Sequence, residues 1–170
     1  MRLLQKIILV GPMGAGKSTL GKLLAKELKW PYFDNDAEMT TRYGISQAEL
    51  ASMPVEELHK IESRYLADVI AQDIPLISGA AASVVDYSEN LRLLETVTTI
   101  YLRIPLSDVL NRAGSTGVGR QALAGNGLEI LTERYNRRDP LYRSVSVFTL
   151  ELSHDVESDS QRLLEVVKNS

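Results

Sequence analysis

Hydrophobic residues along the chain follow two alternating patterns. Short apolar runs bounded by turn residues predict buried β-strands near Lys6–Val10, Pro31–Phe33, Ile74–Ser78, Val97–Ile104 and Val145–Leu152. Between these runs, apolar residues recur every three or four positions, which predicts amphipathic helices. We place helices at about Gly16–Leu28, Asn35–Tyr43, Val55–Ile70, Ser88–Leu94, Leu106–Arg112 and Ser158–Lys168, with a further helix that ends at Asp139-Pro140.

Alternation of strands and helices predicts an α/β fold with a parallel sheet. Right-handed crossovers between the strands would gather their carboxyl ends along one edge of that sheet. We therefore expect the chemistry of the protein at this edge. The length of 170 residues suits a single domain over residues 1–170.

The segment between the first strand and the first helix reads Gly11-Pro12-Met13-Gly14-Ala15-Gly16-Lys17-Ser18-Thr19. It matches the phosphate-loop pattern G-x-x-x-x-G-K-[ST] in the strand-to-helix context that the pattern requires. A positive φ at its three glycines would turn the backbone N–H groups of the loop, including those of Met13 and Ala15, toward a polyphosphate.

Side chains complete this predicted nucleotide site. Lys17 is placed to bridge the β- and γ-phosphates, and Ser18 to offer its hydroxyl to Mg²⁺. Thr19 would support the nucleotide end of the same turn. A chance glycine turn before a helix is the alternative, but the apolar runs on both sides favour a nucleoside triphosphate site.

Composition narrows the class of partner. A formal net charge of −3 gives no general attraction to nucleic acids or anionic membranes, so we expect neither as a partner. Cysteine is absent from the sequence, which excludes disulfides and fits a reducing compartment. The first residues lack a signal-peptide pattern, and no apolar run reaches the ~20 residues needed to cross a bilayer. We expect a cytoplasmic monomer that acts on a small molecule.

Two segments after predicted strands carry candidate chemistry. In Phe33-Asp34-Asn35-Asp36, two carboxylates stand two positions apart, so one can face a Mg²⁺ shell and the other an acceptor, as a kinase requires. Alternatively, one aspartate caps the next helix and the other is solvated. In Ser78-Gly79-Ala80-Ala81, small residues would let backbone N–H groups approach a ligand, or form a plain turn.

Arginines follow in the second half of the chain. The glycine-rich segment Gly114 to Gly127 looks like a lid over a phosphate site, with Arg120 as its closing charge. Arg134, Arg137 and Arg138 lie on the helix that follows and either bind an anion or form a solvated basic face.

Together these segments resemble the shikimate kinase family nearly from end to end. The phosphate loop and the Phe-Asp-x-Asp segment match, Arg120-Gln121-Ala122-Leu123 is similar to the lid motif Arg-Pro-Leu-Leu, and Arg138-Asp139-Pro140-Leu141-Tyr142 is similar to Arg-x-Pro-Leu-Tyr. The resemblance implies a three-layer P-loop NTPase fold with a five-stranded parallel sheet flanked by helices. It also implies an acceptor-binding region at about 35–70 and a lid at about 113–126.

The same resemblance implies roles for individual residues. Asp34 would hold Mg²⁺ through its water shell, and Asp36 would bind the acceptor hydroxyls and accept a proton. Arg138 would bind the acceptor carboxylate, Arg120 would close over the transferring phosphoryl group, and Arg112 would stack on adenine. ATP and Mg²⁺ are the implied phosphoryl donor and cofactor.

The sequence departs from the family pattern in three segments. His59, in Leu58-His59-Lys60-Ile61-Glu62, stands where the family motif Phe-Arg-x-x-Glu has an arginine that shares the acceptor carboxylate. Gly79-Ala80-Ala81 replaces Gly-Gly-Gly at the acceptor, where added methyl groups occupy space and resist positive φ. Gln121 replaces the lid proline, a milder change.

The predicted function is that of an ATP-dependent kinase of shikimate kinase type. It would transfer the γ-phosphoryl group to a hydroxyl of shikimate or a similar small acidic polyol. Two alternatives remain: a nucleotide-binding regulatory or interaction protein without this activity, and a kinase for another acceptor such as the sugar acid gluconate.

Overall fold

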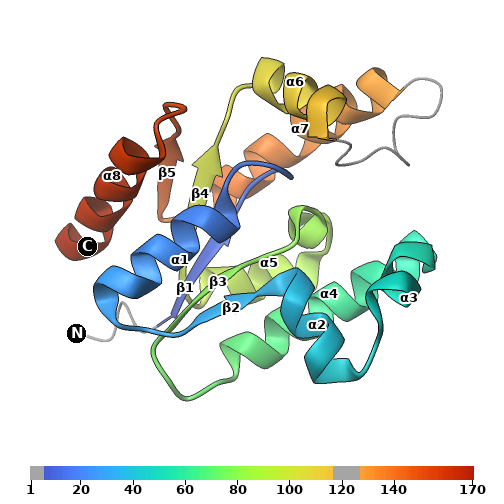
Figure 1. The fold of residues 1–170 in the computed structure, drawn as a ribbon, viewed down its shortest axis with the longest axis horizontal. Helices are drawn as coiled ribbons and strands as arrows, with labels where there is room; N and C mark the ends of the chain where they lie inside the picture. Colours follow the sequence, from blue (N-terminus) through green and yellow to red (C-terminus); the bar gives the residue numbers. More distant parts are fainter. Residues whose placement is uncertain (1–5, 117–126) are drawn as a thin grey trace.

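The structure, a computed structural model, describes residues 6–116 and 127–170. Its centre is a five-stranded parallel sheet in the order β2-β3-β1-β4-β5 (Figure 1). The strands are β1 (Lys6–Val10), β2 (Tyr32–Asp34), β3 (Leu76–Gly79), β4 (Thr98–Arg103) and β5 (Phe148–Glu151). This sheet confirms the predicted fold class, and the central strand β1 leads directly into the glycine-rich loop.

Helices connect the strands. They are α1 (Lys17–Leu28), α2 (Asn35–Tyr43), α3 (Gln47–Ser52), α4 (Val55–Ile70), η1, a 3₁₀ turn (Ala82–Asp86), α5 (Ser88–Glu95), α6 (Leu106–Thr116), α7 (Gly127–Val145) and α8 (Val156–Asn169). The predicted helices at 35–43 and 55–70 have the predicted bounds, and most of the others differ by a few residues at their ends.

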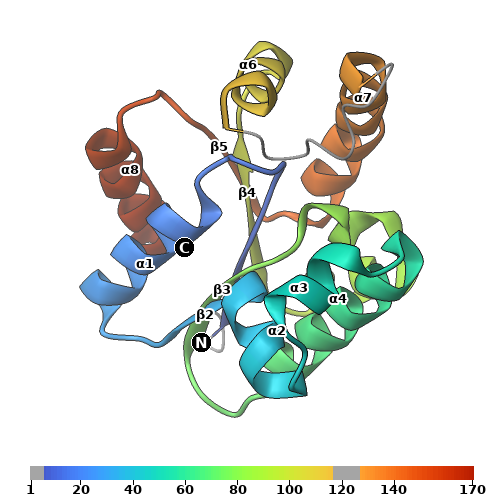
Figure 2. The same cartoon turned by 45° about the vertical axis from the view of Figure 1, so that its right-hand side comes forward.

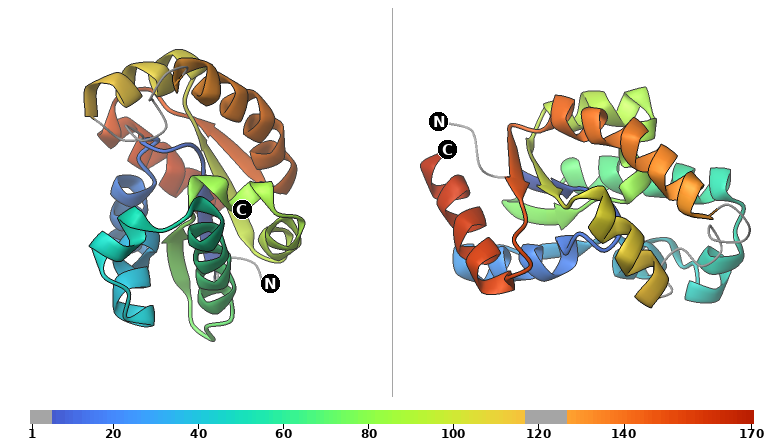
Figure 3. Two further views of the ribbon diagram at one scale, coloured as in Figure 1. Left: turned by 90° about the vertical axis from the view of Figure 1, so that its right-hand side faces the viewer. Right: turned by 90° about the horizontal axis from the view of Figure 1, so that it is seen from above.

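Alternating side chains of β1 divide the core between the two faces of the sheet. Ile7 and Leu9 pack in a cluster with residues of α1 and α8, whereas Ile8 and Val10 pack in a second cluster with residues of α4, α5 and α7. All four side chains are fully buried. Figures 2 and 3 show the resulting layers, with α1 and α8 on one face of the sheet and α4 and α5 on the other.

Helix α7 differs from the prediction that it ends at Asp139-Pro140. It continues to Val145, with Pro140 inside it. Pro140 lies on the exposed side of the helix, while Tyr142 and Val145 beyond it are buried against the sheet. Packing of this last turn therefore outweighs the loss of one helical hydrogen bond at the proline.

The same helix explains why the last strand is shorter than predicted. The apolar run from Val145 was assigned to a strand, but Val145 ends α7 and β5 begins at Phe148. Backbone hydrogen bonds from Val147 to Thr99 and from Leu152 to Arg103 extend the pairing just beyond both ends of β5.

Helix α3 was not predicted, although its sequence carries a start signal. The Ser46 hydroxyl accepts a hydrogen bond from the backbone N–H of Glu49, and the Glu49 carboxylate accepts one from the N–H of Ser46. This reciprocal pair is a capping box. In the part of the chain that the structure describes, no helix is both long enough and apolar enough to cross a membrane.

Candidate active site

The glycine-rich loop lies at the carboxyl end of β1, in front of α1 (Figure 1). Gly11, Gly14 and Gly16 have φ values of 151°, 75° and 94°, as the phosphate-loop prediction requires. At Gly11 a Cβ atom would also lie 2.6 Å from the carbonyl oxygen of Leu102. Glycine at position 11 is therefore needed both for the backbone turn and for the close approach of the loop to β4.

The side chains of the remaining loop residues differ in their exposure. The side chain of Ala15 is buried, and its N–H donates to the carbonyl of Pro12 at 3.2 Å. The side chains of Met13 and Thr19 are exposed. Ala15 therefore packs against the protein interior, whereas Met13 and Thr19 face outward.

Lys17 reaches back over the loop. Its Nζ donates to the carbonyl oxygens of Gly11 at 2.7 Å and Pro12 at 2.9 Å. Burial lowers its pKa from 10.5 to about 8, and the charge of Arg138 adds to this effect, while the carboxylate of Asp36 opposes it. Among the described residues the ammonium contacts carbonyl oxygens and forms no salt bridge, so its charge can be offered to a polyphosphate.

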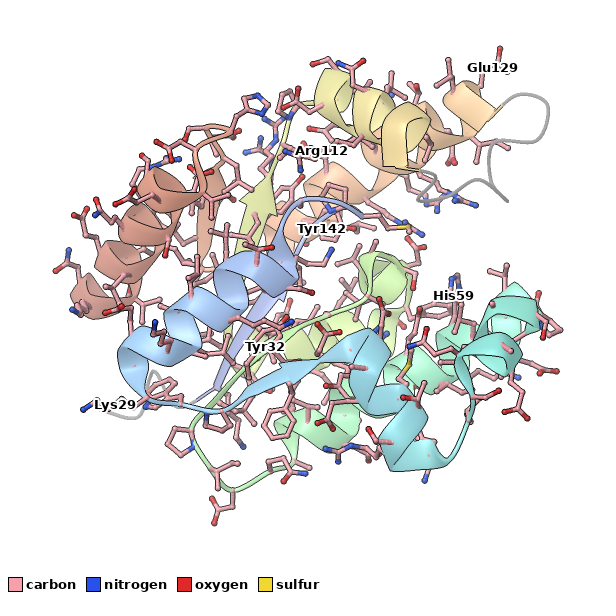
Figure 4. All side chains as sticks on the ribbon, viewed as in Figure 1. Lys29, Tyr32, His59, Arg112, Glu129 and Tyr142 are labelled. Carbon is pink, nitrogen blue, oxygen red and sulfur yellow. The ribbon has the colours of Figure 1, made fainter. Side chains whose placement is uncertain are left out.

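Arg112 comes from α6 and reaches the same loop (Figure 4). Its Nη1 donates to the carbonyl of Gly14, and its Cδ lies 3.6 Å from where a Cβ of Gly14 would be. This contact brings the residue predicted to stack on adenine against the loop.

Asp34 ends β2 and uses its two carboxylate oxygens differently. Oδ1 accepts from the backbone N–H groups of Asp36 at 3.1 Å and Ala37 at 3.4 Å, which caps α2. Oδ2 accepts from the Ser18 hydroxyl at 3.0 Å. Asp34 thus caps the helix, as the alternative interpretation expected, and it also contacts the hydroxyl that is predicted to face Mg²⁺; its magnesium role stays a prediction.

Asp36 lies in the first turn of α2, and its charge acts on Lys17 across the site. The side-chain amide of Asn35, which is buried, donates to Asp36 Oδ1 at 3.2 Å. Sequence reasoning missed Asn35, because an asparagine at a helix start is most simply explained as a turn residue. The hydrogen bond from Asn35 engages Oδ1 of Asp36, and Oδ2 takes no part in it.

Gly79 ends β3 beside β2. A Cβ there would lie 2.9 Å from the Tyr32 hydroxyl and 3.4 Å from Cβ of Lys17, so the glycine allows a close approach. Ala80 is buried and its N–H donates to the carbonyl of Leu9 at 3.0 Å. Among the described residues, only Lys29 and His154 are non-glycine residues with positive φ. The two alanines therefore cause no backbone strain.

His59 lies on α4, as the motif predicts (Figure 4). Its Nδ1 is 2.7 Å from the Tyr87 hydroxyl, and the two rings meet edge to face at 5.7 Å. Burial lowers the pKa of His59, and the positive charge of Arg138 acts in the same direction. The imidazole is therefore neutral near pH 7 and is not a substitute for an arginine.

Arg138 lies on α7 and pairs with Asp86 at the end of η1. Nε donates to both carboxylate oxygens at 3.1 Å, and Nη2 donates to Oδ2 at 2.6 Å. Burial disfavours both charges, but these hydrogen bonds keep the pKa of Asp86 below and that of Arg138 above its ordinary value. Sequence reasoning missed Asp86, because an acidic residue just before a helix is most simply explained as a cap.

Glu62 is one turn after His59 on α4. Its Oε2 accepts a hydrogen bond of 2.6 Å from the Ser83 hydroxyl of η1. Burial raises the pKa of Glu62, and the nearby charge of Asp36 raises it further. The carboxyl group is thus anchored on the acceptor side of the site rather than paired with His59.

These groups come from eight elements of the chain: α1, β2, α2, α4, β3, η1, α6 and α7. A small cavity between the phosphate loop, η1, α6 and α7 is lined by Pro12, Met13, Ala82, Val109, Leu131, Arg134, Tyr135, Arg138 and Tyr142. Arg120, Gln121 and most of the predicted lid lie outside the described residues. Helix α6 continues to Thr116, past the predicted start of the lid.

A parallel sheet in this strand order, with a phosphate loop between β1 and α1, defines the class of P-loop phosphotransferases. Comparison with known proteins narrows the class. The family model for shikimate kinase matches residues 13–168. Curated shikimate kinases include one from Rhodococcus jostii, 37% identical over 144 residues (83% of this chain, 84% of the relative), and one from Chromohalobacter salexigens, 33% identical over 147 residues (86% and 82%).

Solved structures agree with this assignment. Shikimate kinase from Acinetobacter baumannii in complex with shikimate matches with a TM-score of 0.86 and 25% identity, covering 99% of this chain and 94% of that chain. A gluconokinase from Sinorhizobium meliloti, with a TM-score of 0.65 and 14% identity, shows the common fold alone.

The chain belongs to the shikimate kinase family. It is an ATP-using phosphotransferase whose acceptor group is a hydroxyl.

Proposed function

We propose that this protein transfers the γ-phosphoryl group of ATP to a hydroxyl of a small polyol of the shikimate type. The observation that carries the proposal is the meeting of Lys17, the Ser18–Asp34 pair and Asp36 at one edge of the sheet. A polyphosphate site and a carboxylate for the acceptor are then neighbours, as direct phosphoryl transfer requires.

The phosphate loop would bind the polyphosphate. Its three glycines have the backbone conformation of an anion cradle, and the loop leads into the N-terminus of α1. Lys17 would exchange its two carbonyl contacts for phosphate oxygens and stabilise the charge that develops on the transferring group. Arg120 would close over that group from the lid, a role that rests on the family resemblance.

Ser18 and Asp34 fit a magnesium ion. A hydroxyl and a carboxylate oxygen 3.0 Å apart are hard oxygen ligands, and both lie next to the loop. Magnesium, when bound there, would neutralise charge on the phosphates. Asp34 would meanwhile keep its cap on α2, which fixes the direction of its carboxylate.

Asp36 would orient the acceptor hydroxyl and accept its proton. Asn35 holds one of its oxygens, so the other can face the acceptor. Gly79 would let the end of β3 lie close to Lys17, because a Cβ there would be 3.4 Å from Cβ of Lys17.

The proposal is tested by incubating the protein with MgATP and single polyols: shikimate, quinate, gluconate and uncharged cyclic polyols. We expect acceptor-dependent release of ADP and a phosphorylated product visible by ³¹P NMR. Asp36→Asn should bind ATP normally and lose transfer, whereas Asp73→Asn, in the exposed turn after α4, should behave like the wild type. ATP binding without transfer to any acceptor would instead favour a nucleotide-binding regulatory protein.

A further inference from the structure

We infer that Asp86 is a specificity-determining residue: by occupying Arg138 it makes the acceptor site select an uncharged polyol over a polyol carboxylate. The inference rests on the proposed kinase function and names its substrate class. It follows from how Arg138, His59 and the carboxylates around them are paired.

Arg138 already holds a carboxylate. The Nε and Nη2 edge of its guanidinium, which forms paired hydrogen bonds with carboxylates, is filled by Asp86. Both side chains are largely buried, with 14% and 17% of their surface exposed. Arg137 adds a longer contact of 3.5 Å to Asp86 Oδ2. To bind this edge of Arg138, an acceptor carboxylate would have to displace Asp86, which is largely buried and contacts both Arg138 and Arg137.

His59 does not supply a replacement cation. Its imidazole is tied to the Tyr87 hydroxyl, and Tyr87 follows Asp86 directly in the chain. One short segment at the end of η1 therefore occupies both groups that would otherwise be available to a carboxylate. A neutral imidazole and a phenol hydroxyl are instead suitable partners for acceptor hydroxyls.

The charge balance on the acceptor side also disfavours a carboxylate. Asp36, Glu62 and Asp86 are acidic groups that all interact with the region of Arg138. Arg134, one turn before Arg138, lines the same small cavity as Arg138, Pro12 and Met13, and its positive charge also acts on His59. A further negative group next to these carboxylates would be repelled, whereas hydroxyl groups can donate to them.

A matched pair of acceptors tests the inference without any mutation. Shikimate and shikimyl alcohol, in which a hydroxymethyl group replaces the carboxylate, differ in charge and little in shape. For the wild-type protein with MgATP, we expect kcat/KM for the alcohol to exceed that for shikimate at least tenfold. A preference for shikimate, or equal values, would overturn the inference while upholding phosphoryl transfer.

Asp86→Asn tests the cause. The amide keeps the size of the side chain and one acceptor for Arg138 but removes the charge. The kcat/KM for shikimate should therefore rise at least tenfold, and the preference for shikimyl alcohol over shikimate should become smaller. Glu133→Gln is the matched control, because Glu133 pairs with Arg137 on the exposed side of α7 and does not contact Arg138. An unchanged preference in folded Asp86→Asn protein would also overturn the inference.

Binding separates this inference from the proposed function. If no acceptor is phosphorylated, the proposed function fails, and calorimetry of the two compounds with the protein and ADP decides the inference. The alcohol should then bind at least tenfold more tightly than shikimate. Binding of neither compound, or tighter binding of shikimate, would contradict it.

Discussion

Raising the pH from 7 to 9 should weaken ATP binding through the titration of Lys17. In the free protein burial lowers the pKa of this ammonium to about 8, and the charge of Asp36 only partly opposes the effect. Bound phosphates would favour the charged form of Lys17 and so raise its pKa in the complex. ATP binding above pH 8 must therefore be accompanied by uptake of a proton.

The size of the effect follows from this pKa. With a free-state pKa of about 8 and a lysine that stays charged in the complex over this range, the dissociation constant rises about tenfold between pH 7 and pH 9, or about 1.4 kcal/mol. A further tenfold rise is expected by about pH 10. Most of the change lies above pH 8, because the free lysine is still largely protonated below it.

Isothermal titration calorimetry with MgATP, at pH values from 7 to 10 and in buffers of different ionisation enthalpy, measures both the affinity and the proton uptake. Lys17→Met should bind weakly and without this pH dependence, while Lys22→Met, on the exposed face of α1, should follow the wild type. Equal affinities at pH 7 and pH 9 would refute the reasoning, as would the same pH dependence in Lys17→Met.

Three further predictions test the surroundings of the site. Asp34→Ala should reduce stability by about 1 kcal/mol through loss of the α2 cap and should raise the Mg²⁺ concentration needed for activity; thermal melting and a magnesium titration measure these, and an unchanged magnesium requirement would contradict the assignment. Gly79→Ala should destabilise the protein by about 1–3 kcal/mol in chemical denaturation, and by less in a Tyr32→Phe background, because the new Cβ would lie 2.9 Å from the tyrosine hydroxyl; equal losses in both backgrounds would exclude this clash. Lowering the pH through 6.5 should destabilise the wild type more than His59→Gln, because the pKa of His59 is lowered in the folded state and the unfolded chain takes up the proton first; urea unfolding at pH 7 and pH 5 checks this, and parallel curves would argue against it.

Local patterns were sufficient to predict most of the sheet and the phosphate loop. Residues 7–10 of β1 are buried on both faces of the sheet and are continuously apolar, and the glycines of the loop are required by its backbone conformation. Such features depend on neighbours in the sequence. The strand prediction near Val145 failed because tertiary packing, rather than the local apolar run, decides that this residue completes α7.

Side-chain contacts between residues far apart in the sequence could not be predicted from local patterns. The contact of Arg138 with Asp86 joins residues 52 positions apart, and neither residue's neighbours indicate the other. The bond from His59 to Tyr87 spans 28 positions, and no local motif indicates it. The nucleotide side of the site is thus encoded in a continuous motif, whereas the acceptor side depends on how α4, η1 and α7 meet.

Several predictions remain open. The single-domain organisation, the lid and the role of Arg120 stay predictions, as do the monomeric state and the cytoplasmic location.

The central claim is that Lys17 and Asp36 serve one transfer reaction between a polyphosphate and a polyol. Its most direct test follows the label from γ-³²P-ATP in the presence of magnesium and shikimyl alcohol. We predict that the label appears on the alcohol with the wild-type protein and not with Asp36→Asn. Label found only in ATP or in inorganic phosphate, for this alcohol and for every other polyol tried, would contradict the account.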